Sequence, residues 1–567
     1  MHTTSDSIRN SQSAIRNFAD RSIAIGLMVT MVFTVVALGT VEAWSVAIFE
    51  LIVLFLMLLW AAKAVVEKRL EIRIPSAALP LAAFVLLGLI QSIAITGASG
   101  QTKSLSMDVE ATRGAVTVIF FLLVCFLIAA NFFTSTERLR VLANFLVIFG
   151  LALAVFALIQ HLTWEGKLFW IRPTSSAGAG TGGPFVNRNH FAGYMEMLIP
   201  IPLALALSRA TRGEARLFYG FAAAIMGIAQ IASLSRAGIV SLAAGVFFLA
   251  AVATRRNRDE TERAGRGRLR FMFSPAAFMF LMLAAIIGGI FWVGADFNII
   301  KRLSNDPVMS AAATDRKAIW SDTLRMFNAN PILGVGVGAY ETVYPIYGRG
   351  DGSSLIQFAH NDYLQALADG GIVAGALAIW FIIAIFRDFA RGVSLQQPLA
   401  RAIALGAGAG IFAILVHSLF DFNLQIPSNA LLFLVLSATY GVSNFEFRIS
   451  NRNSQFAMRN SKSSSQFSSQ SSKATGSTRL TPVGTCNRVR RARRGSPLLR
   501  TGNKRRSRSG LRFASFARGQ TIPNLATMLS KSCRPQASYN EPENEANDQS
   551  SCDHRGGSGR QGSRSFP

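Results

Sequence analysis

Stretches of mostly apolar residues recur through the first 445 positions, and they constrain the fold more than any other feature of the chain. A helix needs about 20 such residues to cross roughly 30 Å of hydrocarbon. Runs such as Leu51 to Trp60 are apolar on every side, which is not typical of a helix on the surface of a soluble protein. We therefore predict an all-α integral membrane protein with about 12 transmembrane helices, at residues 22–41, 43–62, 76–95, 114–133, 139–160, 190–208, 216–234, 236–253, 272–294, 370–386, 402–420 and 428–445.

The distribution of basic residues predicts the orientation, because short cytoplasmic loops are enriched in Lys and Arg. With residues 1–21 placed in the cytoplasm, the inside segments before the C-terminal tail hold 22 basic residues. The outside short loops hold six: Lys103, Arg113, Lys167, Arg172, Arg188 and Arg236. We expect both termini in the cytoplasm and a membrane domain over residues 22–445, whose first apolar stretch is an uncleaved anchor.

One predicted external loop is long, running from about residue 295 to 369 between the ninth and tenth helices. Within it, we expect a helix from Thr314, as N-cap, to Asn330, which Pro331 ends. The run Gly334 to Gly338 lacks the Lys and the flanking strand of a phosphate-binding loop, so it indicates a tight turn.

The tail, residues 446–567, carries much of the chain's charge. It holds 23 of the 57 basic residues and 6 of the 31 acidic ones, so +17 of the formal +26 lies here. Few of its residues are large and apolar, and we predict a disordered cytoplasmic tail. Its basic clusters, at 488–494 and 504–508, are suited to anionic lipid headgroups. Aromatic residues are sparse among them, and no nucleic acid is expected as a partner.

A few polar residues at the predicted outer face are candidates for chemistry. Arg236 lies in a hairpin between two predicted helices, and Arg316 lies in the long loop. Their guanidinium groups are suited to binding phosphate or carboxylate. A solvated or interfacial Arg is the simpler interpretation of each. His360 ends the long loop and is a candidate general base. His417 and Asp421, four residues apart, are spaced to share a helix face and form a hydrogen bond.

Four sequence segments together resemble the O-antigen ligase and O-antigen polymerase superfamily of multi-pass membrane glycosyltransferases. They are Phe185-Val186-Asn187-Arg188-Asn189-His190-Phe191-Ala192-Gly193-Tyr194; Ser235-Arg236-Ala237-Gly238; Arg316 to Trp320 with Asn330 to Gly336; and His360-Asn361, then nine residues, then Gly371. The likeness covers roughly residues 20–445 and includes the long external loop. One departure is Ala374, where the family usually has a second Gly.

The resemblance implies transfer of a glycan from a polyprenyl-pyrophosphate carrier to an acceptor hydroxyl at the outer face of the bacterial cytoplasmic (inner) membrane. It implies that Arg236 and Arg316 stabilise the pyrophosphate and that His360 is the catalytic base. Substrate contacts are expected from Asn187, Arg188, Asn189, Asn361, His417 and Asp421. The implied partners are the lipid-linked glycan, a glycan or lipid-anchored sugar acceptor, and membrane lipids. The implied reaction is inverting and requires neither metal nor cofactor.

Two other functions stay open at this point. Glu50 and Glu196 fall inside apolar stretches, and carboxylates there are candidates for ion handling, so a small-anion transporter such as a bicarbonate carrier is one alternative. A non-catalytic scaffold that binds a lipid-linked glycan is the other. The choice between ligase and polymerase, which differ in the acceptor, also stays open.

Overall fold

The chain folds into a bundle of apolar helices. The computed structural model describes residues 2–96, 102–174, 182–264, 307–349, 355–440 and 445–450. All of them belong to one unit that spans Met1–Thr475, while a second unit, Gly476–Pro567, lies outside the described residues. The predicted disordered tail also lies outside them, apart from its first residues.

Within the described residues, 9 helical segments are long and apolar enough to cross a membrane. They are α1 (His2–Val36), α2 (Ala43–Val66), α4 (Val109–Phe132), α5 (Thr136–Leu162), α6 (Arg188–Leu198) joined to α7 (Pro200–Leu207), α8 (Gly213–Ala232), α9 (Arg236–Ala264), α14 (Asp362–Gly392) and α15 (Pro398–His417). Two shorter apolar helices, α3 (Ala78–Gln91) and α16 (Pro427–Ala438), accompany them. Each corresponds to a predicted stretch, and the remaining stretch, 272–294, lies outside the described residues.

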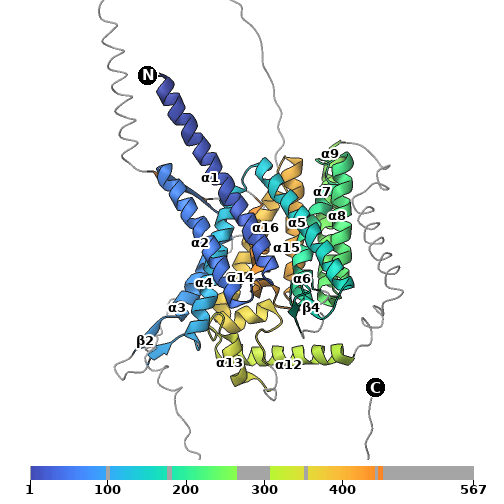
Figure 1. Ribbon diagram of the computed structural model, residues 1–567. Coiled ribbons are helices and arrows are strands. Elements are labelled where there is room, and N and C mark those ends of the chain that lie inside the picture. The colour runs from blue at the N-terminus through green and yellow to red at the C-terminus, as the bar shows by residue number, and fades with distance from the viewer. Residues whose placement is uncertain are drawn as a thin grey trace, which may run out of the picture. The chain divides into compact units, whose positions relative to one another are not determined.

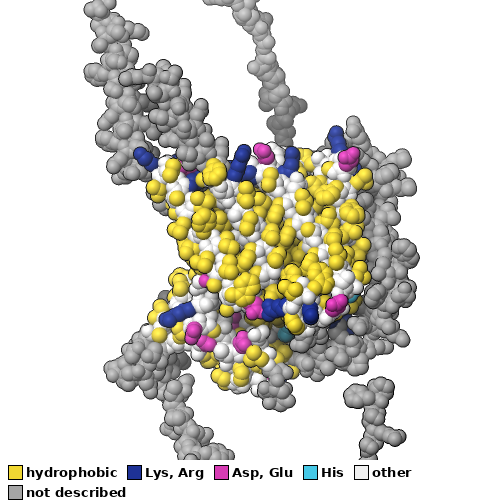
Figure 2. Space-filling view, viewed as in Figure 1, with side chains coloured by type: hydrophobic (Ala, Val, Ile, Leu, Met, Phe, Trp, Pro, Cys, Tyr) yellow, Lys and Arg dark blue, Asp and Glu magenta, His cyan; other side chains and the backbone are white. Residues whose placement is uncertain are grey.

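The surface of the bundle has the composition of a membrane protein. Figure 2 shows a broad apolar band on the face in view, with Lys, Arg, Asp and Glu gathered along its two margins. Large apolar side chains such as Leu51, Phe55 and Phe247 are exposed on the surface of the bundle. Helices satisfy their own backbone hydrogen bonds, so they are stable in hydrocarbon where an open strand is not. The protein is therefore a multi-pass membrane protein.

The centre of the bundle is built on close contact between α15 and the α6–α7 pair. The apolar window in residues 188–207 is 94% buried, whereas the window in α2 is 22% buried. Glycines on α15 allow this approach: a Cβ at Gly410 would lie 2.3 Å from the carbonyl oxygen of Met197, and one at Gly406 would lie 2.8 Å from that of Pro200. Small residues let helix backbones approach closely in a bilayer.

Short elements lie at the ends of the bundle. In Figure 1, α12 (Pro307–Ala329), α13 (Tyr340–Tyr347) and the hairpin of β2 (Ala94–Thr96) and β3 (Thr102–Ser104) lie at the end away from the start of α1. The hairpin of β4 (Lys167–Leu168) and β5 (Arg172–Pro173) follows α5. Elsewhere, β1 (Arg69–Ile74) pairs antiparallel with β6 (Phe445–Ser450), so the predicted tail begins with a strand.

The helix predicted from Thr314 begins earlier. α12 starts at Pro307, and Thr314 lies inside it instead of capping it. Proline is well suited to the first turn of a helix because its fixed φ is already helical. The alanines at 311–313 are strong helix formers and carry the helix through Thr314.

The turn after α12 is bonded directly to the backbone of α14. Val335 N donates to Ala368 O at 2.9 Å and Gly336 N to Asp369 O at 2.9 Å, while Ile372 N donates to Pro331 O at 2.8 Å. Gly334, Gly336 and Gly338 all have positive φ, in line with the predicted tight turn. α14 breaks its helical geometry at Gly371, where φ is 63° and ψ is −159°, and this break frees the carbonyls that the turn uses.

A single buried amide links this turn to α3. Gln91 Nε2 donates to Leu333 O at 2.6 Å and to Asp369 O at 3.1 Å, and Gln91 Oε1 accepts from Val337 N at 3.0 Å. The short helix α3, the turn at residues 331–338 and α14 are thus held together at Gln91. A Cβ added at Gly370 would lie 2.5 Å from the Cβ of Ala374. The absence of a side chain at Gly370 therefore leaves room for Ala374, at the position where the family that the sequence resembles usually has Gly.

Replacing Gly371 by Ala should destabilise the folded protein. A Cβ there would meet Ile332 O at 2.2 Å, and positive φ costs a non-glycine residue about 1–2 kcal/mol before that clash. We expect a lower thermal unfolding temperature in detergent and less protein in the membrane. Gly114→Ala in α4 is the matched control, because nothing lies within 4 Å of its Cβ. Equal unfolding temperatures for the two variants would contradict this role of Gly371.

The segment that contains α12 and α13, residues 307–349, has its own charged anchor at Asp322, which is 2% exposed. Its carboxylate accepts from the Arg325 guanidinium at 2.8 Å, from Arg349 Nε at 2.9 Å and from Arg349 N at 3.1 Å. Burial alone would raise the pKa of Asp322, but these hydrogen bonds and charges lower it below its ordinary value. The carboxylate thereby ties α12 to the chain that follows α13.

The lowered pKa of Asp322 predicts that acid loosens this segment. A carboxylate with a lowered pKa stabilises the fold above its unfolded value of about 3.9 and loses that effect as pH falls through the folded value. We expect amides of residues 347–349 to lose protection from hydrogen exchange, after correction for the intrinsic rate, between pH 6 and pH 3. Asp322→Asn should lower protection at least about tenfold already at pH 6. Glu137→Gln, at an exposed carboxylate of α5, should not; unchanged protection in Asp322→Asn would disprove the anchor.

Candidate functional site

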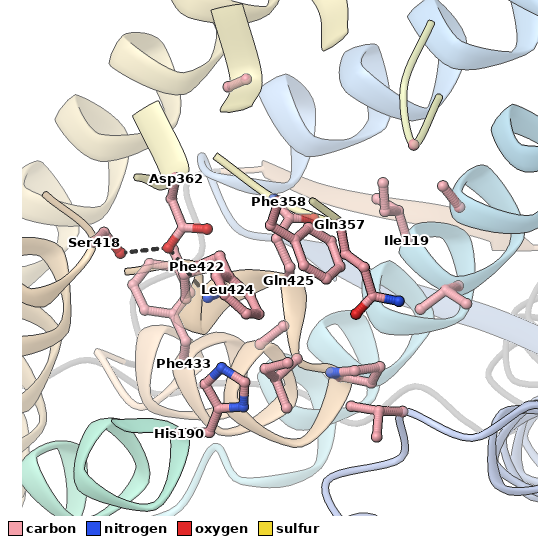
Figure 3. A pocket seen from close by; sticks show the side chains of 18 of the residues that line it. Ile119, His190, Gln357, Phe358, Asp362, Ser418, Phe422, Leu424, Gln425 and Phe433 are labelled. Carbon is pink, nitrogen blue, oxygen red and sulfur yellow. Dashed lines mark hydrogen bonds between the residues drawn. The ribbon is translucent and has the colours of Figure 1, made fainter. Parts of the chain in front are cut away.

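A cavity of about 1420 Å³ lies at the end of the bundle that carries α12 and α13. Its polar part is lined by three arginines among the described residues, Arg172, Arg188 and Arg316, together with His360. Its apolar part continues between the helices, where Val118 and Ile119 of α4, Phe381 of α14 and Phe433 and Leu434 of α16 line it. Figure 3 shows part of this lining. Glu42, Glu341, Asp362 and Asp369 line it too, so the cavity combines charged groups of both signs with an apolar interior.

His360 enters the cavity from the chain just before α14. Asn361 is the N-cap of that helix: its side-chain oxygen accepts from Tyr363 N and Leu364 N, and its Nδ2 donates to Leu419 O at 3.0 Å. The backbone of Asp362 donates to Ser418 O at 2.9 Å. His360 itself has a φ of 50°, a conformation that is uncommon for a residue with a side chain. The contacts of the next two residues hold it there.

The turn after α15 supplies a buried carboxylate that meets His360. Asp421 Oδ1 lies 3.1 Å from His360 Nδ1, and Asp421 Oδ2 lies 3.7 Å from the Arg316 guanidinium and accepts from Asn189 Nδ2. Burial alone would raise the pKa of Asp421, but the His360 hydrogen bond and the neighbouring positive charges hold it well below its usual range. An ionised Asp421 keeps the imidazole proton on Nδ1, which leaves Nε2 as the proton acceptor.

The first sequence motif contributes the opposite wall. Asn187 is the N-cap of α6 and accepts from Asn189 N at 2.9 Å. Arg188 and Asn189 line the cavity, and Asn189 reaches Asp421. Three predicted site residues from distant parts of the chain, Arg316, His360 and Asn189, thus meet at one carboxylate. Asn187 and Asn361 serve as helix caps, and contact between them and a substrate stays a prediction.

Arg236 occupies a different position. It is the exposed first residue of α9 and is not among the described residues that line the cavity. The start of α9 packs on α6, since a Cβ on Gly238 would come within 2.6 Å of the Ala192 Cβ, and Gln230 Nε2 of α8 donates to Gly238 O at 2.8 Å. Its role as a phosphate ligand stays a prediction.

His417 and Asp421 do not form the side-chain pair that their spacing suggested. α15 ends at His417, so Asp421 lies beyond the helix, and the geometry of residues four apart on one helix does not apply. His417 Nδ1 instead lies 3.1 Å from both carboxylate oxygens of Glu196 on α6. All atoms of this pair are buried, and neither residue lines the cavity. Glu196 therefore joins α6 to α15 and does not face the space where a solute would bind.

An aromatic ring that the sequence did not indicate lies beside His360. The ring of Phe422 contacts those of His360, His190 and Phe358, with centroids 4.8, 4.9 and 4.5 Å away. Asp362 and His190 also line the cavity, and neither was predicted as a site residue from the sequence. Both lie within the motifs that carry the family resemblance. Phe422 follows Asp421 directly, and one apolar residue in an apolar chain gives no separate signal.

Comparison with known families finds one match in the central part of the chain. Residues 221–379 match the family Wzy_C, described as O-antigen ligase. The matched range begins in α8 and ends in α14, and it contains Arg236, Arg316 and His360. None of the curated proteins compared with the chain matches it. The match supports the resemblance found in the sequence: residues 221–379 are similar to the O-antigen ligase family.

Proposed function

We propose that this protein transfers a glycan from a polyprenyl-pyrophosphate carrier to an acceptor hydroxyl, as an O-antigen ligase or a polysaccharide polymerase of the bacterial inner membrane. The observation that carries the proposal is the contact between His360 and the buried Asp421 in a cavity lined by arginines. The Wzy_C match at residues 221–379, which include His360 and Arg316, supports it. The acceptor is a glycan or a lipid-anchored sugar.

The proposal includes the orientation. Twelve crossings result when the nine long segments, α3, α16 and the apolar stretch at 272–294 are each counted as one. An even number leaves the N-terminus and the tail on the cytoplasmic side, as the bias of basic residues predicts. The cavity then opens outside the cell, where nucleotide-linked sugars are not supplied and a lipid-linked donor is required.

The two parts of the cavity fit the two parts of such a donor. Arg316 and Arg188 face the mouth, where guanidinium groups bind phosphate oxygens with paired hydrogen bonds. Arg172 lies there too and forms an ion pair with Glu42 at 2.7 Å. The apolar interior between α4, α14 and α16 accommodates an isoprenoid chain that continues into the bilayer.

The proposed step is a direct displacement at C1 of the sugar. The acceptor hydroxyl gives its proton to Nε2 of His360 as its oxygen bonds to C1, and the C1–O bond to the pyrophosphate breaks. The electron pair leaves with the pyrophosphate, whose charge Arg316 stabilises where it develops. Asp421 stays ionised and stabilises the imidazolium. One displacement inverts the configuration at C1, and side chains supply both the base and the cations, so we propose a metal-independent, inverting glycosyltransferase.

Replacing His360 by Ala should abolish most of the transfer while leaving the protein in the membrane. Loss of a general base lowers rates about 10²–10⁴-fold. The measurement is glycan transfer by purified protein in nanodiscs, with lipid-linked donor and sugar acceptor. His161→Ala, at the end of α5 and outside the cavity lining, is the matched control. Transfer by His360→Ala at the wild-type rate would favour a different base.

The variant Asp421→Asn separates orientation of His360 from binding of the donor. An amide does not hold the Nδ1 proton as a carboxylate does, so we expect a fall in kcat of at least about tenfold. Because Asp421 does not line the cavity, the KM for the donor should change by less than about threefold. A large rise in KM with kcat unchanged would show instead that Asp421 acts through substrate binding.

A further inference from the structure

One part of the cavity beside His360 has no role in the proton transfer. The rings of Phe358 and Phe422 form a stack there, with centroids 4.5 Å apart and an interplanar angle of 22°. The amides of Gln357 and Gln425 lie next to these rings, and both residues are exposed to the cavity that they line. Figure 3 shows the four side chains around one region of the cavity.

Two buried polar atoms in the same region lack a partner among the described residues. Asp362 is 8% exposed and His190 is 7% exposed, yet Asp362 Oδ1 and His190 Nε2 make no hydrogen bond. Both residues line the cavity. A buried polar atom without a hydrogen-bond partner destabilises the folded protein. A ligand with hydroxyl groups at this place would remove that destabilisation.

The side chains of this region suit a sugar ring, a pyrophosphate and an isoprenoid chain to different degrees. The unpartnered oxygen of Asp362 is suited to a hydroxyl group, and amides both donate to and accept from hydroxyls. Aromatic faces are negative and attract the C–H groups of a sugar ring, which carry partial positive charge. An isoprenoid chain would leave all these polar atoms unsatisfied. The region therefore fits a sugar ring better than the pyrophosphate or the lipid.

We propose that Phe358, Phe422, Gln357, Gln425, Asp362 and His190 form a pyranose-binding subsite that holds a sugar ring next to the catalytic base. The Phe422 and His360 ring centroids are 4.8 Å apart, so a ring bound here lies within reach of His360. This inference rests on the proposed function. The ring belongs either to the donor glycan or to the acceptor, and the same contacts serve both.

Binding measurements test the subsite without requiring turnover. The first arm titrates purified protein in nanodiscs with geranylgeranyl pyrophosphate and with the same lipid bearing one glucosyl, galactosyl or N-acetylglucosaminyl group. The second arm titrates the corresponding methyl pyranosides into protein saturated with the sugar-free lipid. The variants are Gln425→Leu and Phe358→Leu. Gln396→Leu, at an exposed Gln between α14 and α15 and outside the cavity lining, is the matched control.

We expect wild-type protein to bind one sugar-bearing probe more tightly than its sugar-free counterpart, and each variant to lose about threefold to tenfold of that affinity. Loss in the first arm assigns the subsite to the donor ring, and loss in the second assigns it to the acceptor ring. Affinity for the sugar-free lipid should not change. If no sugar probe in either arm depends on Gln425 or Phe358, the subsite is wrong.

The two proposals fail in different ways. Sugar binding that depends on Gln425 and Phe358 without any glycan transfer by wild-type protein would leave the subsite in place and point to a non-catalytic glycan-binding protein. Transfer with unaltered KM for donor and acceptor in both variants would support the enzyme and overturn the subsite.

Discussion

The arrangement of the site depends on one buried carboxylate. Asp421 is fully buried, and it is contacted by Arg316 from α12, His360 from the start of α14 and Asn189 from α6. A buried charge is tolerated only when it is paired and hydrogen-bonded, so each of these three elements is constrained by the others. Removing any one partner leaves the carboxylate less compensated, which favours a single arrangement of the mouth of the cavity.

The segment that carries Arg316, residues 307–349, is attached to α14 and also closed on itself. Its turn pairs with the backbone of α14 around Gly371, and Arg349 at its end is tied back to Asp322 of α12. Arg316 lies on α12, the helix that leads into the turn. The glycine in the His-Asn-x9-Gly pattern therefore has a physical role: it breaks α14 where the turn needs free carbonyl groups. The residues around Asp421 and the turn after α12 are thus linked through α14.

Much of the fold follows from composition, because a bilayer admits few alternatives to apolar helices. Eleven of the twelve predicted stretches are helices, and the exception lies outside the described residues. The partners within the site were harder to predict. Periodicity suggested that His417 and Asp421 pair, yet the helix ends between them and their partners, Glu196 and His360, lie 221 and 61 residues away. Contacts at such separations depend on how helices pack, which no local pattern specifies.

The buried amide of Gln91 has a consequence for the synthesis of the protein. Its acceptor at Leu333 lies 242 residues further along the chain. At about 5–20 residues per second, that segment is made roughly 10–50 s after α3. During this interval the short helix α3, which has 14 residues, lacks the backbone groups that later form hydrogen bonds with the side chain of Gln91, its last residue. The contact between α3 and the turn after α12 therefore forms only once that turn has been made, so the cavity, whose lining includes Val337 and Gly338 of the turn, is completed late in biogenesis.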